Sequence, residues 1–141
     1  MNRMNSRGIR VVSALALLYG FASLVHHVHN TLYLADYPNM PEWLTPLRVM
    51  LAWAFVAGVG VLGGGLLYHR FESAGLIVLG VFAGLGFCGL DHFAIAKMSE
   101  HTFWMNFTIL FEVGAAFLLL NAVAFHLPRL MRNDESGKCA T

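Results

Sequence analysis

Histidines dominate the side chains of this protein that could do chemistry, and most of them gather in one place. Five of the seven histidines fall at the same end of the chain's long apolar segments: His26, His27, His29, His92 and His101. Asp91 and Glu112 fall in the same half of those segments. Ionisable side chains are costly in a bilayer and usually face the interior of a helix bundle or a water-filled cavity, so each marks a candidate functional site. This one-sided group of imidazoles and carboxylates predicts a polar pocket.

The spacing of these residues places them on particular helix faces. His26, His29 and Asn30 lie within about one third of a helix circumference, because they follow i, i+3 and i+4 spacing. Asp91 and His92 are neighbours on another segment. A third segment carries one stripe that includes His101, Met105, Thr108 and Glu112. Three segments therefore contribute polar side chains to the expected pocket.

Neutral imidazoles and carboxylates are ligands for Cu, Zn, Ni, Co and non-haem Fe, so the inventory predicts a transition-metal site without distinguishing the metal. The expected ligands are His26, His29, Asp91 and His92. Residues expected at the mouth of the pocket are His101, Asn106 and Asn30. Metal transport, metal delivery and a metal-dependent redox role are all compatible with this set.

Glu112 is expected to lie deeper than the histidines. It is about ten residues, or ~15 Å, from the outer end of its segment and therefore close to the membrane midplane. A carboxylate at that depth needs a cation or a hydrogen-bond donor beside it. We expect Glu112 to act as a proton or ion relay, and Glu112 and Asp91 are the candidate acid–base residues.

Two other functions fit the same residues. The first is an oxidoreductase subunit with a b-type haem, whose axial ligands would be His26 or His29 on one helix and His92 on another. The second is a metal-free enzyme that acts on a lipid or an isoprenoid, with Glu112 or Asp91 as acid or base and a histidine as its partner. A purely structural membrane subunit would instead tolerate mutation of the cluster.

One short motif supports the metal hypothesis. The stretch Gly89-Leu90-Asp91-His92 resembles the Gly-x-Asp-His stretch of the hydrogenase and urease accessory permeases. The resemblance covers four residues, and Phe87-Cys88 stands where those permeases carry a His-Pro pair. It implies a role for Asp91 and His92 toward a nickel or cobalt ion.

Composition and segment length predict the fold class. The chain is 57% hydrophobic and 12% charged, whereas a typical soluble domain has about 25% charged residues. Four apolar segments are each long enough to cross a hydrocarbon core of ~30 Å: about 9–34, 46–68, 73–98 and 102–127. Thr45-Pro46 is a candidate cap and first-turn pair for the second segment. We therefore expect an all-α integral membrane protein, a four-transmembrane-helix bundle.

Residues 1–128 are expected to form that single domain, with the first segment kept as an anchor, and Pro128 is expected to end the last helix before a polar tail, 129–141. Seven of the nine basic residues fall on one side: Arg3, Arg7, Arg10, Arg70, Arg129, Arg132 and Lys138. The positive-inside rule then predicts a multi-pass protein of a cell membrane, such as a bacterial inner membrane, with both termini cytoplasmic. Its partners are expected to be the lipid bilayer and further membrane subunits or copies of itself. A net charge of +1 gives no reason to expect nucleic acid.

Overall fold

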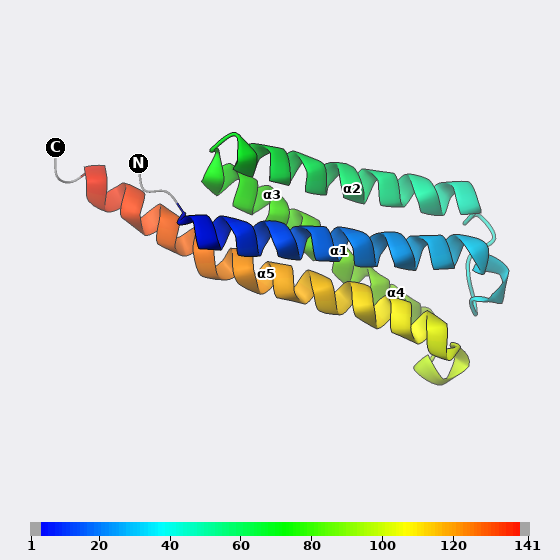
Figure 1. Ribbon diagram of the computed structural model, residues 1–141. Helices are drawn as coiled ribbons and strands as arrows, with labels where there is room; N and C mark the ends of the chain where they lie inside the picture. Colours follow the sequence, from blue (N-terminus) through cyan, green and yellow to red (C-terminus); the bar gives the residue numbers. More distant parts are fainter. Residues whose placement is uncertain (1–3, 139–141) are drawn as a thin grey trace.

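The computed structural model describes residues 4–138, and side chains as far as residue 132. Within this range the chain is helical, with short connections (Figure 1). Four helices or helix series in the described part are long and apolar enough to cross a membrane. The elements are α1 (Ser6–Leu32), η1 (Leu34–Asp36), α2 (Pro46–Tyr68), α3 (Glu72–Leu85), η2 (Gly86–Leu90), α4 (Asp91–Ile95), η3 (Met98–Glu100) and α5 (Phe103–Lys138).

The helix starts follow from local side-chain chemistry. The Asn5 side chain accepts a hydrogen bond from the backbone N–H of Gly8 and caps α1. Thr45 caps α2 by accepting from the backbone N–H of Arg48, and Pro46 occupies the first turn. The cap predicted for the second span is therefore confirmed. These side chains satisfy backbone N–H groups that have no partner inside the helix.

The bundle consists of two tightly packed helix pairs. In Figure 1, α2 lies along α3 and α1 lies along α5, while the connections 33–45 and 96–102 lie at the end away from the termini. Gly75 allows the close approach of α3 to α2, because a Cβ atom there would lie 2.8 Å from the backbone nitrogen of Leu67. The main core is apolar and includes Val12, Leu76, Leu79 and Leu119, all without exposed surface.

The sequence predicts one continuous helix for the third span, but the structure does not show one. The span changes to a 3-10 helix at Gly86 and returns to α-helix at Asp91, and it ends at Ile95 rather than at Met98. A 3-10 stretch has a tighter turn and a different side-chain direction from an α-helix. The 3-10 segment lies two-thirds of the way along the span and directly precedes the short helix that carries His92. The direction of the His92 side chain therefore differs from that in a continuous α-helix.

The last helix also differs from the prediction, because α5 passes through Pro128 and continues to Lys138. Proline lacks the N–H that would bond the carbonyl four residues earlier, which usually ends or kinks a helix. At Pro128 the missing bond would go to the Ala124 carbonyl. The next carbonyl, that of Phe125, accepts from the Arg129 side chain at 2.8 Å, and the guanidinium lies 3.2 Å from the centre of the Phe125 ring. The expected tail is thus helical as far as residue 138, and Cys139 lies outside the described residues.

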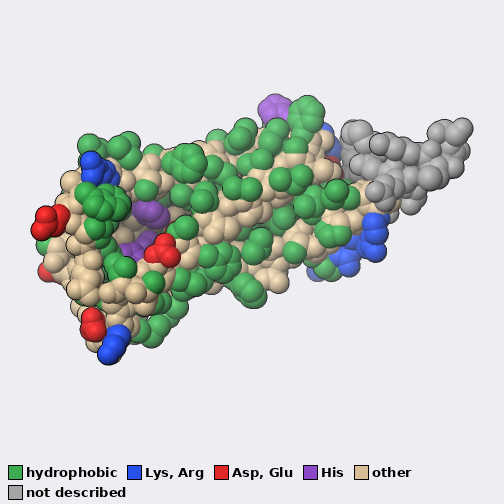
Figure 2. Space-filling model, turned by 180° about the vertical axis from the view of Figure 1, so that it is seen from behind, with side chains coloured by type: hydrophobic (Ala, Val, Ile, Leu, Met, Phe, Trp, Pro, Cys, Tyr) green, Lys and Arg blue, Asp and Glu red, His purple; other side chains and the backbone are tan. Residues whose placement is uncertain are grey.

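The surface between the two ends is apolar. In Figure 2 hydrophobic side chains cover the length of the bundle, whereas most charged side chains in that view lie towards its ends. Large apolar residues such as Leu17, Phe55 and Val61 are more than half exposed. In water such a surface would be an aggregation site, whereas lipid tails would solvate it.

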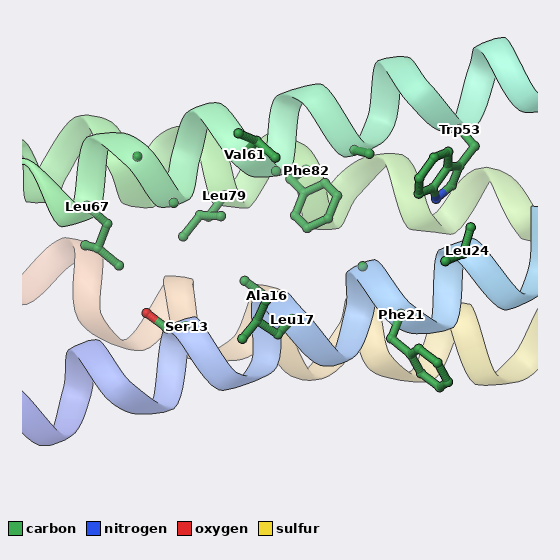
Figure 3. Close-up of a pocket in the computed structure, with 15 residues that line it drawn as sticks. Ser13, Ala16, Leu17, Phe21, Leu24, Trp53, Val61, Leu67, Leu79 and Phe82 are labelled. Atoms are coloured by element: carbon green, nitrogen blue, oxygen red, sulfur yellow. The ribbon is translucent and has the colours of Figure 1, made fainter.

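A groove of about 490 Å³ separates the two helix pairs on one side (Figure 3). Trp53 of α2 and Leu24 of α1 stand at one end of the groove, and Phe82 of α3 points into its middle. None of its lining residues is a histidine or a charged residue, and Ser13 is the polar side chain among them. The groove is therefore distinct from the polar pocket that the sequence predicts.

Candidate functional site

Three histidines and a tyrosine form a buried group at the end of the bundle opposite the chain termini. We call His26, His92, His101 and Tyr37 the imidazole cluster. Their exposed fractions are between 3% and 8%. The ring centroids of His26 and His92 are 5.3 Å apart, and those of His92 and His101 are 6.2 Å apart. Imidazole surface is visible in a recess at this end of the molecule (Figure 2).

His26 comes from the buried face of α1, as its spacing predicts. Its Nδ1 lies 3.5 Å from the Thr108 hydroxyl on α5. That hydroxyl donates to the Met105 carbonyl, so its oxygen is available to accept from His26 Nδ1–H. The lone pair of His26 is then on Nε2, which faces Glu112.

Glu112 lies beneath the cluster, with 3% of its surface exposed. Its Oε2 is 3.7 Å from His26 Nε2, and its Oε1 is 3.9 Å from Nδ1 of His27. His27 Nδ1–H donates to the Ser23 carbonyl at 2.9 Å, which fixes the orientation of that ring. Glu112 is nine residues after the start of α5, about 14 Å along the helix. The structure therefore places a carboxylate deep in the bundle beside two imidazoles.

His92 and His101 share one unusual property. His92 Nε2 accepts from the Asn30 side-chain amide at 3.2 Å, and His101 Nδ1–H donates to the Lys97 carbonyl at 3.0 Å. The other ring nitrogens, His92 Nδ1 and His101 Nε2, are buried without a hydrogen-bond partner. A buried polar atom without a partner costs about 1–3 kcal/mol. Each ring is held by one nitrogen and has its second nitrogen unused.

Tyr37 packs against these rings from the first connection, although the sequence analysis had not identified it as a site residue. Its ring centroid lies 5.0 Å from that of His92 and 6.2 Å from that of His101. Its hydroxyl is 3.0 Å from His29 Nδ1. Burial raises the pKa of Tyr37 to about 12, so the phenol is neutral at physiological pH. Tyr37 lies in an irregular segment rich in proline, where no periodicity could have indicated its direction.

The four expected metal ligands are not brought together. The Asp91 side chain is exposed at the start of α4, whereas its neighbour His92 is buried. His29 is half-buried and is hydrogen-bonded to Tyr37 at the edge of the cluster. Within the described residues, no three histidine, cysteine, aspartate or glutamate side chains already lie close enough together to hold an ion.

The residues expected at the pocket mouth divide into two groups. His101 and Asn30 are buried parts of the cluster, with 7% and 6% of their surface exposed. Asn106 instead braces the third connection, because its amide donates to the Met98 carbonyl at 3.0 Å. His69 and His126 lie near the end of the bundle that carries the termini, where His69 contacts the Tyr68 ring and His126 contacts the Phe125 ring.

Haem bound between His26 and His92 would require these two imidazole rings to move apart. His26 and His92 stand in edge contact, with an angle of 81° between their planes. A porphyrin bound between two axial imidazoles needs a gap across which both rings point at the iron. The contact between these two rings does not offer that gap.

Comparison with protein-family models, with curated proteins and with solved structures found no significant match to this chain. The function must therefore be inferred from the site itself.

Proposed function

We propose that this membrane protein binds one transition-metal ion in the imidazole cluster, with His92 and His101 as its protein ligands. The observation that carries the proposal is the pair of buried ring nitrogens without partners. Histidines that bind metals characteristically use one nitrogen for the metal and the other for a hydrogen bond that orients the ring. His101 Nδ1–H already donates such a bond to the Lys97 carbonyl, whereas the His92 ring is held by a bond that its Nε2 accepts from Asn30.

The spacing of the rings supports this proposal. At metal–nitrogen distances of about 2.0–2.1 Å, two imidazoles on one ion have ring centroids roughly 5–6.5 Å apart, depending on the angle at the ion. The His92 and His101 centroids are 6.2 Å apart. Two protein ligands leave coordination positions for water or for a ligand from a delivery partner. His26 is the nearest further imidazole, and the Glu112 carboxyl group lies beside it.

An ion held in this way would be exchangeable, which suits transport or delivery. Imidazole ligands favour Cu, Zn, Ni, Co and Fe over the alkaline-earth ions, because nitrogen donors suit these borderline metals. In the described part of the chain a hydrophobic core lies between the cluster and the end that carries the termini, so an ion would enter from the opposite end. The proposed function is therefore to take up a metal ion at one face of the membrane.

The wild-type protein is expected to bind one ion per chain. The test is equilibrium titration of detergent-solubilised protein without a His-tag, with Cu(I), Cu(II), Zn²⁺, Ni²⁺, Co²⁺ and Fe²⁺ each supplied alone. Elemental analysis gives the stoichiometry. His69→Ala and His126→Ala should bind like the wild type, because those rings lie away from the cluster. Absence of saturable binding for every ion would overturn the proposal.

A second candidate function rests on Glu112. Its carboxyl group lies 3.7 Å from His26 Nε2, so a small movement would bring these two groups into contact for exchange of a proton. In a metal-free protein the cluster would serve acid–base chemistry on a lipid-soluble substrate. A wild-type protein that refuses every ion in the titration would favour this function.

The orientation of the bundle is also a proposal. By their positions between and beyond the four spans in the sequence, seven of the nine basic residues fall on the side of the termini, which by the positive-inside rule would be cytoplasmic. The imidazole cluster would then face the outside of the cell or the periplasm. In a bacterial host, green fluorescent protein fused to the C-terminus should fluoresce, and alkaline phosphatase fused there should be inactive. Active phosphatase with a dark fluorescent fusion would reverse the orientation.

A further inference from the structure

Asn30 stands at the junction between α1 and the metal site proposed above. Its side chain is 94% buried, as the exposed fraction is 6%. Asn30 Nδ2 donates to His92 Nε2 at 3.2 Å, while Asn30 Oδ1 has no hydrogen-bond partner. The second nitrogen of the same histidine, His92 Nδ1, has no partner either. Each of the two residues joined by this hydrogen bond therefore has one buried polar atom without a partner.

This hydrogen bond fixes the position of the ring proton. When His92 Nε2 accepts, the proton of the neutral ring must be on Nδ1. In that tautomer Nδ1 has no lone pair for a metal ion. The observed contact therefore describes a form of the site in which His92 is oriented but is not yet able to ligate.

A half-turn of the Asn30 amide reverses this situation without changing the shape of the side chain. The rotation brings Oδ1 to His92 Nε2, and a carbonyl oxygen accepts from Nε2–H. The ring proton then belongs on Nε2, and the lone pair belongs on Nδ1, where an ion can bind. Both atoms that lacked partners acquire one, because Oδ1 receives the Nε2 proton and Nδ1 receives the metal.

We propose that Asn30 is a positioning residue that selects the tautomer of His92, holding it with the proton on Nδ1 when the site is empty and on Nε2 when an ion is bound. This inference rests on the proposed metal-binding function. A carboxylate in place of the amide would accept only, and would hold the ion-binding tautomer permanently. The neutral amide supports both tautomers, so it allows the ion to leave as well as to bind.

The test combines a spectroscopic measurement with a binding measurement. Nitrogen NMR of protein labelled with ¹⁵N-histidine reports which ring nitrogen of His92 carries the proton, assigned by its loss in His92→Ala. The metal probe is whichever of the six ions the wild type binds. The unloaded wild type should have the proton on Nδ1, and addition of the ion should move it to Nε2.

Two substitutions and one control separate this role from a purely structural one. Asn30→Asp should place the proton on Nε2 without an ion and tighten binding about 10–100-fold, whereas Asn30→Leu should weaken binding by about the same factor. Asn121→Leu is the control, since Asn121 is exposed and bonds only the Phe117 carbonyl of its own helix. Its binding should equal that of the wild type.

The inference and the proposed function can fail separately. If the wild type binds an ion but the unloaded His92 already has its proton on Nε2, the tautomer selection is wrong and the metal site stands. The same holds if Asn30→Asp folds and binds no more tightly than the wild type. If the wild type binds no ion, both are overturned, even where the NMR spectrum shows the Asn30–His92 hydrogen bond.

Discussion

His92→Ala and His101→Ala are each expected to lower the affinity for the bound metal ion by at least about 100-fold. Even residues that only orient a metal ligand change affinity about 10–100-fold when mutated, and each of these substitutions removes a proposed ligand itself. In each variant the remaining imidazole keeps its own hydrogen bond. A loss of metal affinity would therefore report the removal of one ligand and not a reorientation of the other. The measurement is the same equilibrium titration, with the thermal unfolding temperature as a check on folding.

Asp91→Ala is the matched control for this pair. Asp91 is adjacent to His92 in sequence, yet its side chain is exposed and lies outside the cluster. Its removal should leave the affinity within a factor of about 3, roughly the change that 0.7 kcal/mol produces. If Asp91→Ala loses the ion and His101→Ala retains it, the ligand set suggested by sequence alone is the correct one.

His92 is buried and its neighbour Asp91 is exposed, and the sequence alone could not show which of the two faces the bundle interior. Asp91 is three residues after Cys88 and seven after Gly84, a spacing that would place the three on one face of an uninterrupted helix. All three are exposed in the structure, so that face points away from the bundle interior. In a soluble protein a charged face would have been assigned to solvent at once. In a membrane span the outer surface is apolar, and a carboxylate near the end of the span could belong to either side.

The first and fourth spans were easier to interpret. On α1, i, i+3 and i+4 spacing placed His26 and Asn30 on one face, and both are buried there. On α5 the same reasoning joined Thr108 with Glu112, and both are buried. Length and hydropathy were sufficient to place the four long helices, because a bilayer requires about 20 apolar residues for each crossing.

Residues in the connections could not be placed in this way. Tyr37 follows a 3-10 turn in the first connection and has no helical period that would show its direction. His101 also follows a 3-10 turn and precedes α5, so the stripe that it shares with Met105 extends from the helix into the connection. Their positions depend on contacts between connections, such as the hydrogen bond from the Asn39 amide to the Ile95 carbonyl. The 3-10 break at Gly86 similarly depends on packing against other helices, which local sequence does not reveal.

Gly86→Ala is expected to destabilise the protein and also to disturb the metal site. A Cβ atom on Gly86 would lie 2.6 Å from the Ala116 Cβ and 2.7 Å from the Tyr19 ring. Both neighbours are completely buried and cannot move aside. Overpacking of this kind costs about 1–3 kcal/mol. Because Gly86 begins the 3-10 segment that leads to His92, relief of the clash would shift that imidazole relative to His101.

The free energy of unfolding in detergent should therefore fall by about 1–3 kcal/mol in Gly86→Ala, and metal affinity should fall with it. Gly84→Ala provides the comparison, since Gly84 is two residues earlier and a Cβ atom there would meet nothing within 4 Å. That variant should keep both properties, because it adds the same methyl group on the open side of α3. Equal stability and equal affinity in the two variants would mean that the 3-10 segment does not position His92. Lower stability with unchanged affinity would mean that the packing of the third span and the geometry of the imidazoles are independent.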